Sequence, residues 1–569
     1  MLKFYTFLIF LSGFAQVRAQ SVFAPIDKDY YDLIDRMDIK GYTGFLFTNI
    51  KPTLRVNIAA LADSASSDTA RHFSKVDKRN LQYLRDDNWE WSNRNNAGDA
   101  PEHILKAFYT KKNALATVNT KYFQVQINPV LNISYGKDAD SGGVRKTTSI
   151  STRGIELRGL IDGKVGFYTF LTDNQAVFPT YVSNRIATTT AVPGEGYWKS
   201  FKKTGYDFYT VAGYVDFPIT KHISTQFGED RNFIGDGYRS LLLSDYSGNY
   251  LFWKVSTKVW KLQYDNVVSQ MVGDMLNHTT GDVFYPRKYM SYHYLTYNVT
   301  KHFNIGLFEC ITFGNTDTIH NRQFDPTYLN PIIFFKAAEN GLGAPDKDHL
   351  GLTWKWNLFR HLSFYGQILI DEFNLVEIRS KKGWWGNKQA GQVGLKYIDV
   401  AGVRNLDIQL EGNIVPPYTY THFSYSKSTD YSYYANYSNT DQPLAHPSGA
   451  NFYEGIALLR YQPFYRFTFT GKYFYTVTGL DGPGQDWGSN IMIGYNHRMD
   501  DYGNYITQGY HTTIQLISLC LTTRIAHNMF IDLSAIWRQE VSTFYSYNSD
   551  DKSVMVSFRW NIGKRLQEF

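Results

Sequence analysis

Cysteine and proline are scarce in this chain. Its 569 residues include only two cysteines, Cys310 and Cys520, and 17 prolines. Each cysteine lies inside an apolar run, "GLFECITFG" or "LISLCLTTR", where a lone thiol packs as a small hydrophobic side chain. We therefore predict two free thiols, because two isolated cysteines do not make a disulfide framework.

Long hydrophobic runs are missing beyond the first residues. Lys3, the apolar core "FYTFLIFLSGFA" and the small-residue site "VRA" ending at Ala19 are typical of a secretory signal peptide. After it, no stretch reaches the roughly 18 apolar residues of a transmembrane helix. We expect residues 1–19 to be a signal peptide and the mature chain to begin near Gln20. An exported chain without membrane helices can still span a membrane as a β-barrel.

Neither sign of charge dominates, and no catalytic motif is present. The 58 basic and 52 acidic residues give a net charge of +6, too weak and dispersed to indicate nucleic-acid binding. The 14 histidines are scattered, with no H-E-x-x-H, P-loop or dinucleotide-binding glycine motif. "DSGG" at 140–143 lacks the histidine and aspartate context of a serine nucleophile. We expect no catalytic residue, metal or cofactor, and hence no enzyme.

Aromatic residues are abundant, and most of the chain alternates with a period of two. Tyrosine, phenylalanine and tryptophan make up 17% of the residues. Runs such as "YFQVQINPVLNISY", "LGLTWKWNL", "LDIQLEGNI" and "SVMVSFRW" place apolar side chains on one face and polar ones on the other. Segments of about ten alternating residues, joined alternately by short and long connections, are typical of transmembrane barrels.

We therefore predict an all-β transmembrane barrel over residues 119–569, with long extracellular loops. The strand-like runs amount to about 18 antiparallel strands, an even number that puts both ends of the barrel on the periplasmic side. "NIMIGYNHR" at 490–498 then belongs to an outer loop. Residues 20–118 show helical periodicity, for example in "DKDYYDLIDRM" behind a possible Asp27 N-cap, and predict a small periplasmic α-helical bundle.

Charged side chains on inward faces need partners of opposite sign. The segment "FGEDRNFIGDGYRSLLLSD", residues 227–245, concentrates such groups where a strand enters an outer loop. We expect an arginine–carboxylate network that shapes the mouth of the barrel and could present Arg231 and Arg239 to an acidic glycan. The predicted lumen and mouth charges are Glu229, Asp230, Asp236, Lys355, Arg538 and Arg559.

Some aromatic residues stand in predicted outer loops beside polar groups. Trp384 and Trp385 are adjacent in "KKGWWGNKQ", and Tyr328 lies in "DPTYLNPIIFFKAAENG", which resembles a helical segment. A flat ring beside hydrogen-bonding groups suits a pyranose, whose faces are apolar and whose edges are polar. These three residues, with Arg231 and Arg239, are the candidate glycan contacts. The alternative is an interfacial girdle or loop packing on the rim.

Five motifs resemble the Wzi family of capsule-assembly outer-membrane proteins, and more closely its Bacteroidetes branch, which includes the gliding-motility protein RemB. They are "STRGIELRGLIDGKVGFYTFLTDN", "FGEDRNFIGDGYRSLLLSDYSGNY", "DPTYLNPIIFF", "GQILIDEF" and "NFYEGIALLRYQP". The resemblance implies a lectin in the outer membrane of a Gram-negative cell. Its partners would be capsular or surface polysaccharide and outer-membrane lipid. The alternatives are an accessory of gliding motility or its secretion machinery, with protein partners, and a channel.

Overall fold

The computed structural model describes most of the chain: residues 21–42, 46–68, 73–93, 98, 109–273, 285–314, 324, 326–335, 347–422, 435–544, 547–565 and 567–569. The predicted signal peptide and most of the predicted helix in "APEHILKAFYTK" lie outside these residues. Helices within the described ranges are all too short or too polar to cross a membrane.

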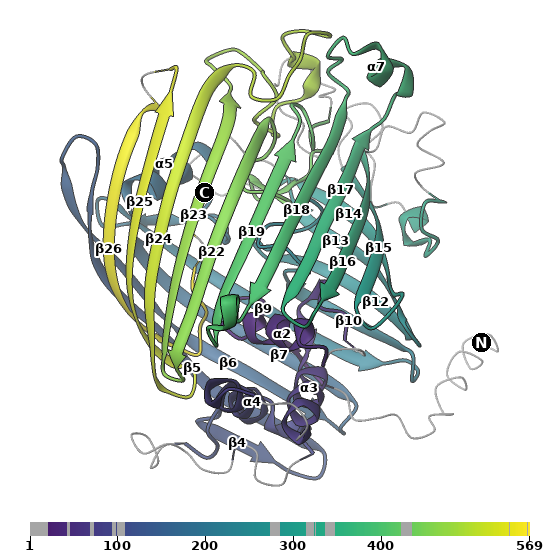
Figure 1. The fold of residues 1–569 in the computed structure, drawn as a ribbon, viewed down its shortest axis with the longest axis vertical. Helices are drawn as coiled ribbons and strands as arrows, with labels where there is room; N and C mark the ends of the chain where they lie inside the picture. Colours follow the sequence, from purple (N-terminus) through teal and green to yellow (C-terminus); the bar gives the residue numbers. More distant parts are fainter. Residues whose placement is uncertain are drawn as a thin grey trace.

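Within the described residues, eighteen antiparallel strands close into a barrel (Figure 1), which confirms the predicted fold class. β26 pairs with β5 to close the ring, and the short strands β4 (Ala116–Asn119) and β8 (Lys199–Phe201) pair onto its margins. The barrel strands are β5 (Phe123–Ala139), β6 (Arg145–Ile161), β7 (Val165–Val177), β9 (Gly205–Pro218), β10 (Ile223–Asp230), β12 (Tyr250–Val259), β13 (Leu262–Val272), β14 (Arg287–Asn298), β15 (Phe303–Gly314), β16 (Lys347–Leu358), β17 (Leu362–Glu372), β18 (Lys388–Ile398), β19 (Leu406–Val415), β22 (Phe452–Phe464), β23 (Phe467–Leu480), β24 (Tyr510–Ala526), β25 (Met529–Ser542) and β26 (Ser549–Trp560).

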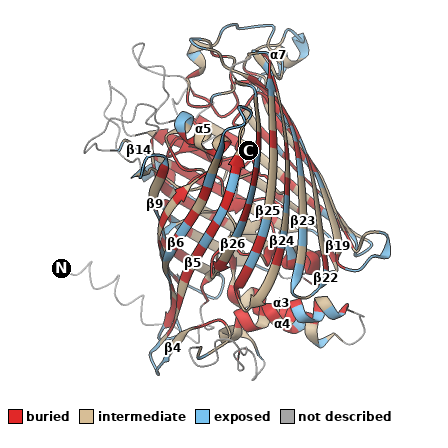
Figure 2. Ribbon diagram, turned by 90° about the vertical axis from the view of Figure 1, so that its left-hand side faces the viewer, coloured by how far each residue is buried: buried red, intermediate tan, exposed pale blue. Residues whose placement is uncertain are grey.

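Burial alternates along the barrel strands as the sequence predicts (Figure 2). At the β5–β26 junction Tyr135 pairs with Val556, and these outward side chains are 61% and 52% exposed. The next pair, Ser134 and Ser557, faces inward, and Ser134 is buried. Outward apolar and inward polar side chains are what a barrel surrounded by lipid requires.

Short and long connections lie at opposite ends of the barrel. The tight turns at 219–222, 299–302, 359–361 and 527–528 lie at the end where the N-terminal helices are found (Figure 1). The long connections lie at the other end, and one of them, 481–509, contains "NIMIGYNHR" as predicted. The first connection at this end, 140–144, is shorter than the others, because β5 and β6 extend their pairing to Ala139 and Arg145.

Three helices pack together at the short-turn end: α2 (Tyr31–Ile39), α3 (Arg55–Ser67) and α4 (Lys75–Asp87). Their shared core includes Leu33, Ile58 and Leu84, each at most 2% exposed. The N-cap prediction for Asp27 is wrong. Tyr30 occupies the N-cap position of α2, and Asp27 instead accepts a hydrogen bond from the backbone of Gly563.

The remaining elements are short. β1 (Phe23–Ala24) pairs with β3 (Thr53–Leu54), β2 (Ile50–Lys51) with β11 (Phe233–Ile234), and β20 (Ser438–Asn439) with β21 (Gln442–Pro443). The short helices are η1 (Trp89–Trp91), α5 (Thr180–Thr189), η2 (Pro326–Leu329), α7 (Leu375–Ser380), η3 (Val400–Gly402) and η4 (Tyr495–His497).

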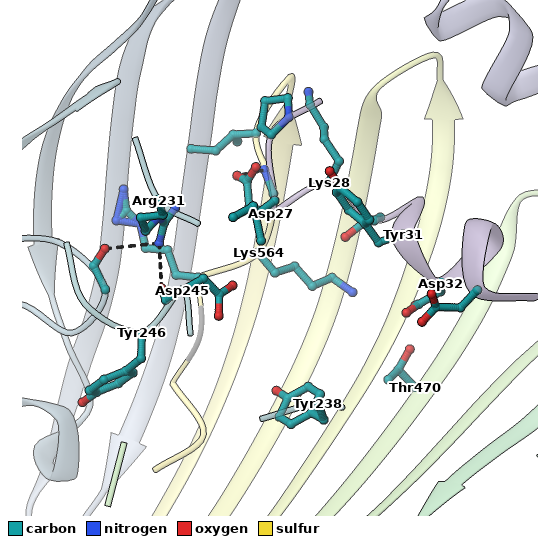
Figure 3. Close-up of a pocket in the computed structure, with 18 of the residues that line it drawn as sticks. Asp27, Lys28, Tyr31, Asp32, Arg231, Tyr238, Asp245, Tyr246, Thr470 and Lys564 are labelled. Carbon is teal, nitrogen blue, oxygen red and sulfur yellow. Dashed lines mark hydrogen bonds between the residues drawn. The ribbon is translucent and has the colours of Figure 1, made fainter. Parts of the chain in front are cut away.

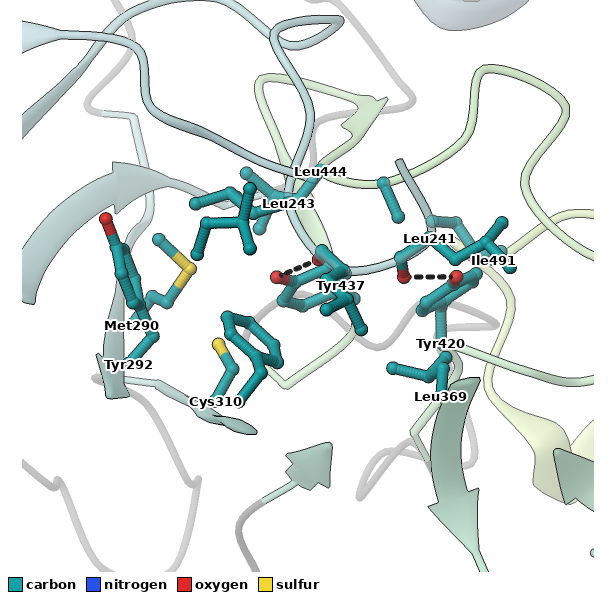
Figure 4. Close-up of a cluster of buried hydrophobic side chains, with 14 of the residues drawn as sticks. Leu241, Leu243, Met290, Tyr292, Cys310, Leu369, Tyr420, Tyr437, Leu444 and Ile491 are labelled. Atoms are coloured by element: carbon teal, nitrogen blue, oxygen red, sulfur yellow. Dashed lines mark hydrogen bonds between the residues drawn. The ribbon is translucent and has the colours of Figure 1, made fainter. Parts of the chain in front are cut away.

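The interior of the barrel contains a hydrophobic core (Figure 4). Leu241 and Leu243 from the β11–β12 connection and Tyr420 and Tyr437 from the β19–β22 connection pack against inward side chains of the wall, among them Cys310. Hydroxyl groups of the two tyrosines donate to the carbonyls of Leu241 and Leu242, at 2.7 and 2.6 Å. Cys310 is a buried free thiol and Cys520 a free thiol, as predicted.

Candidate functional site

The charged segment 227–245 turns into the barrel instead of forming an outer mouth. β10 ends at Asp230, and the chain next pairs β11 with β2 of the N-terminal region, inside the lumen. Phe233 of β11 is 4% exposed, and the Nζ of Lys51 lies 4.9 Å from its ring centroid. The predicted arginine–carboxylate network therefore belongs to the lumen.

Arg239 is buried at the centre of this inserted segment. Its backbone and that of Tyr238 donate to the two carboxylate oxygens of Glu411 on β19, at 3.1 and 2.7 Å. The guanidinium of Arg239 stacks over Tyr238 and Phe474, donates to the carbonyl of Glu568 and lies 3.8 Å from Glu454. With 5% exposure, Arg239 braces the lumen and does not present its charge to the outside.

Two neighbouring glycines make this path possible. Gly235 has a φ of +137°, and a Cβ there would lie 2.2 Å from the Nε2 of Gln367 on β17. A Cβ on Gly237 would lie 2.6 Å from a carboxylate oxygen of Glu411. Glycine avoids both clashes because it has no side chain.

The last residues of the chain also lie in the lumen. After β26, residues 561–569 turn back, and the C label lies among the barrel strands in Figure 1, away from the predicted periplasmic end. Glu568 pairs with Lys472 at 2.6 Å, and the Phe569 ring lies 5.8 Å from Tyr181 of α5. The backbone oxygen of Phe569 accepts from Arg538 at 3.0 Å.

Wall cations hold the N-terminal region in place. Lys355 on β16 lies 2.8 Å from Asp38 of α2 and 3.1 Å from Asp236 of the inserted segment. Arg559 on β26 contacts Asp29 at 2.9 Å and also Asp532. These ion pairs cross-link the wall, α2 and the inserted segment.

A cavity of about 370 Å³ remains between these inserted parts (Figure 3). Asp27, Tyr31 and Asp32 line it from the N-terminal region, Arg231 from the β10–β11 connection and Tyr246 from the β11–β12 connection. The Nη1 of Arg231 donates to the carbonyls of Asp245 and Gly194, at 3.1 and 3.4 Å. Arg231 and Asp230 therefore border an internal chamber.

Two of the predicted site residues lie elsewhere than expected. Glu229 shares the outward face of β10 with Phe227, and its cross-strand neighbour Leu251 is an exposed apolar residue. Its assignment to the lumen is therefore corrected. Tyr328 is 5% exposed and stacks on Phe313 with centroids 4.0 Å apart, so its ring is used in packing. The segment around it is a 3-10 turn, η2, and the next residues, 330–334, are not helical, whereas residues 336–341 of the predicted helix lie outside the described residues.

The adjacent tryptophans differ in their surroundings. Trp385 has Tyr495 at 4.6 Å, the guanidinium of Arg498 at 4.4 Å and the Nζ of Lys388 at 4.7 Å from its ring centroid. Trp384 is half-buried, lies 5.6 Å from Trp385 and covers Gly386. Trp385 thus lies at the centre of a ring cluster with Tyr495 and Arg498 of the outer loops, and Trp384 lies beside it. Arg498 also pairs with Asp501 at 2.5 Å, and Lys388, the first residue of β18, is fully buried.

The 481–509 loop carries an unusual carboxylate near this cluster. Burial, together with the neighbouring charge of Asp481, raises the pKa of Asp486 to about 8. Its Oδ1 accepts from the backbone of Gly488 at 2.9 Å. Around neutral pH this group is therefore largely protonated, and one negative charge is absent from the loop.

Sequence reasoning missed the partners of Trp385. Tyr495 and Arg498 stand in "NIMIGYNHR", which the parity of the connections places in an outer loop and which continues into "MDDYGNYITQG". Its signal was the repeated combination of tyrosines with amides and charges, the same argument that selected "KKGWWGNKQ". Lys388 stands in "KKGWWGNKQ" itself, three residues after Trp385, but its second ring contact, with Tyr495, joins residues about 110 positions apart, an interval that no local pattern reveals.

A closed antiparallel barrel with long connections at one end defines the class of fold, and the chain is similar to solved barrel structures. The Escherichia coli protein Wzi, described as an outer membrane protein involved in group 1 capsule assembly and as a carbohydrate-binding β-barrel, matches with a TM-score of 0.55 and 12% identity, over 97% of this chain and 100% of that one. OccK8 (OprE) of Pseudomonas aeruginosa matches with a TM-score of 0.41 and 10% identity, over 76% and 97%. OprD of the same organism matches with a TM-score of 0.41 and 11% identity, over 76% and 93%.

At these identities the likeness establishes the fold alone. No protein-family model matches the chain, and no curated protein sequence matches it. The similarity to Wzi extends over the whole barrel and the N-terminal helices, as the coverage of both chains shows.

Proposed function

We propose that this protein is an outer-membrane barrel without enzymatic activity that binds or organises capsular or surface polysaccharide through its outer loops. The observation that carries the proposal is the ring-and-cation cluster around Trp384 and Trp385, at the end of the barrel opposite the helices. Aromatic faces pack against the apolar faces of sugar rings, and a cation nearby attracts acidic sugars. The carbohydrate-binding description of Wzi, which has the same fold, supports it.

The filled lumen favours a binding role over transport. The β11–β12 connection, the N-terminal helix α2 and residues 561–569 all enter the barrel and are joined by ion pairs. Inward side chains pack into a hydrophobic core at the level of Cys310. A specific channel needs a continuous polar path, so a channel is the weaker alternative.

Residues 1–19 as a signal peptide and 20–118 as a periplasmic bundle complete the proposal. Export to the outer membrane would then place the helices on the periplasmic side and the Trp384 cluster outside the cell. An accessory role in gliding motility or its secretion machinery would instead require protein partners. A deletion strain separates the two: loss of capsule with normal gliding and secretion supports polysaccharide binding.

A tryptophan replacement tests the site directly. We expect Trp384→Ala to weaken binding of the purified protein to the organism's own surface polysaccharide by about tenfold, the equivalent of one lost ring contact of about 1.4 kcal/mol. The matched control is Trp260→Ala, which removes a 76% exposed tryptophan from a short turn at the opposite end. Equal binding by both variants and the wild type would remove Trp384 from the site.

A further inference from the structure

A second pocket lies beside the Trp384 cluster. It has a volume of about 390 Å³ and is formed entirely by the 481–510 stretch between β23 and β24. Its lining combines the rings of Trp487, Tyr502 and Tyr505 with the polar side chains of Gln485 and Asn504. The volume falls within the range of small-molecule sites, and such a mixture of rings and amides orients a polar ligand.

The pocket has a fixed floor. The indole Nε1 of Trp487 donates to Gln485 at 3.1 Å, and Gln508 donates to the backbone oxygen of Trp487 at 3.0 Å. A Cβ on Gly509 would lie 2.7 Å from the Trp487 ring, so the ring rests directly on the backbone. Buried Asn451, next to the start of β22, donates to the carbonyl of Gln508 at 2.9 Å and ties the loop to the barrel. A preformed floor reduces the entropy lost on binding.

Two tyrosines at the rim of this pocket keep about half or more of their surface exposed. Tyr502 is 49% exposed and Tyr505 is 65% exposed. Each offers an apolar face next to a hydroxyl group, the combination that makes tyrosine frequent at binding surfaces. Together with the Trp487 floor they suit a ring-shaped ligand that carries hydroxyl groups.

The charges around the pocket indicate an uncharged ligand. Asp500 is the ionisable carboxylate in the lining, and no lysine or arginine is found among the described residues that line the pocket. An acidic sugar would face this carboxylate without a cation to compensate it, which costs free energy. The Trp385 cluster differs, because the partly exposed guanidinium of Arg498 lies against its ring, where it also pairs with Asp501.

The two surfaces share a segment of backbone. Trp385 donates to the carbonyl of Asp501 at 3.0 Å, Gly503 to the carbonyl of Lys382 at 2.8 Å, and Asn504 to the carbonyl of Gly383 at 2.9 Å. Residues 501–504 therefore border the pocket and also carry the loop that contains the tryptophans. One oligosaccharide can contact both surfaces without a change in the loops.

We propose that this pocket is a subsite for an uncharged pyranose residue of the polysaccharide, next to the rings of the Trp384 cluster and the guanidinium of Arg498. The inference rests on the proposed function and deepens it by naming the class of sugar. It predicts that the pocket recognises ring faces and hydroxyl groups, and that its contribution to affinity is independent of uronic-acid charge.

Isothermal titration calorimetry with two probes tests this inference. The first probe is the organism's own surface polysaccharide, and the second is the same material after carboxyl reduction, which converts uronic acids to neutral sugars. Tyr505→Ala should weaken binding of both probes by a similar factor, about tenfold, whereas Tyr505→Phe keeps the ring and should stay close to wild type. Tyr122→Ala, which removes a 61% exposed tyrosine near the opposite end, is the matched control.

Each result has a distinct meaning. If the wild type binds neither probe, the proposed function fails and the inference fails with it. If the wild type binds and Trp384→Ala weakens binding while Tyr505→Ala matches Tyr122→Ala, the pocket is not a subsite although the proposed function stands. If the effect of Tyr505→Ala disappears after carboxyl reduction, the pocket holds a charged sugar and the neutral assignment is overturned.

Discussion

Lys355 offers a quantitative test of how the lumen is held together. Its Nζ lies 2.8 Å from Asp38 of α2 and 3.1 Å from Asp236 of the inserted segment, and it also donates to Thr48. All three charged residues are less than 9% exposed. Lys355→Met keeps a side chain of similar length but leaves two buried carboxylates without their cation.

Removing one partner of a buried ion pair costs about 3–5 kcal/mol, because the remaining charge is left uncompensated. We therefore expect the variant to lose about 3–5 kcal/mol of stability, a change of roughly 10²- to 10³-fold or more in the folded fraction at equilibrium. The control Lys552→Met removes a pair with Asp550 whose side chains are 67% and 37% exposed. An exposed pair contributes only about 0–1 kcal/mol.

The assay is urea unfolding of the detergent-solubilised barrel, followed by the gel mobility of unboiled samples. A third variant sharpens the test: Lys355→Met combined with Asp38→Asn and Asp236→Asn removes the unpaired charges together. Replacing a whole buried charge cluster with neutral groups is often close to neutral for stability, so this variant should recover much of the loss. The reasoning is refuted if Lys355→Met is no less stable than Lys552→Met, or if the triple variant recovers nothing.

Three further predictions concern the inserted segment, the closure of the lumen and the outer loop. Gly235→Ala should destabilise the barrel by about 1–3 kcal/mol in the same urea-unfolding assay, because its φ is +137° and the new Cβ would clash with Gln367. The control Gly455→Ala has open space around its Cβ and should change the stability little. Deleting residues 567–569 removes the Glu568 pair with Lys472 and the Phe569 ring from the lumen. Planar-bilayer recordings of this variant should show larger or more frequent conductance than recordings of the wild type. Equal conductance would contradict the idea that these residues close the lumen. The pKa of Asp486 is raised from its ordinary value of 3.8 to about 8. The stability of the folded loop is therefore fully present below about pH 3.8 and is lost progressively as pH rises to about 8, because the unfolded loop releases the proton first. Proteolysis of the 481–509 loop should accelerate between about pH 5 and 8 and change little above that, and Asp486→Asn should abolish the change.

The barrel could be predicted from the sequence because its signal is local and repeated. Each strand alternates over about ten residues, and the alternation persists whatever the loops do. The strand total and the placement of "NIMIGYNHR" in an outer loop followed from the parity of the connections and are confirmed. The one shortened loop, 140–144, reflects pairing that continues through polar residues, where alternation is weak.

The path of residues 231–249 could not be predicted in the same way. A long connection has no periodicity that distinguishes an outward course from an inward one. Two local features did carry information: the glycines at 235 and 237, which permit close approach, and the run "LLL" at 241–243, which is buried completely. Charges next to an apolar run indicate a segment that needs both polar and apolar partners, and the interior of this barrel supplies both.

The different contacts of Trp384 and Trp385 could not be predicted from a local sequence pattern either. Both residues have the same sequence neighbours, and alternation says nothing about which ring is covered. Trp385 is covered by Tyr495 and Arg498, more than 100 residues later, an interval set by the packing of two outer loops. Candidate residues can thus be proposed from loop composition, but their exposure depends on contacts between loops.

The distribution of ion pairs favours the outer loops over the lumen as the place where a ligand binds. In the lumen, Asp29, Asp35 and Asp38 lie 2.5–2.9 Å from Arg559, Lys396 and Lys355 respectively, so these acids and bases satisfy one another. A solute entering there would have to displace contacts that already stabilise the fold, and breaking buried pairs is costly. At the outer loops, Tyr502 and Tyr505 keep about half or more of their surface in water. A ligand that covers those rings gains the hydrophobic contribution without breaking any ion pair, so the free energy of binding is more favourable at the outer loops than in the lumen.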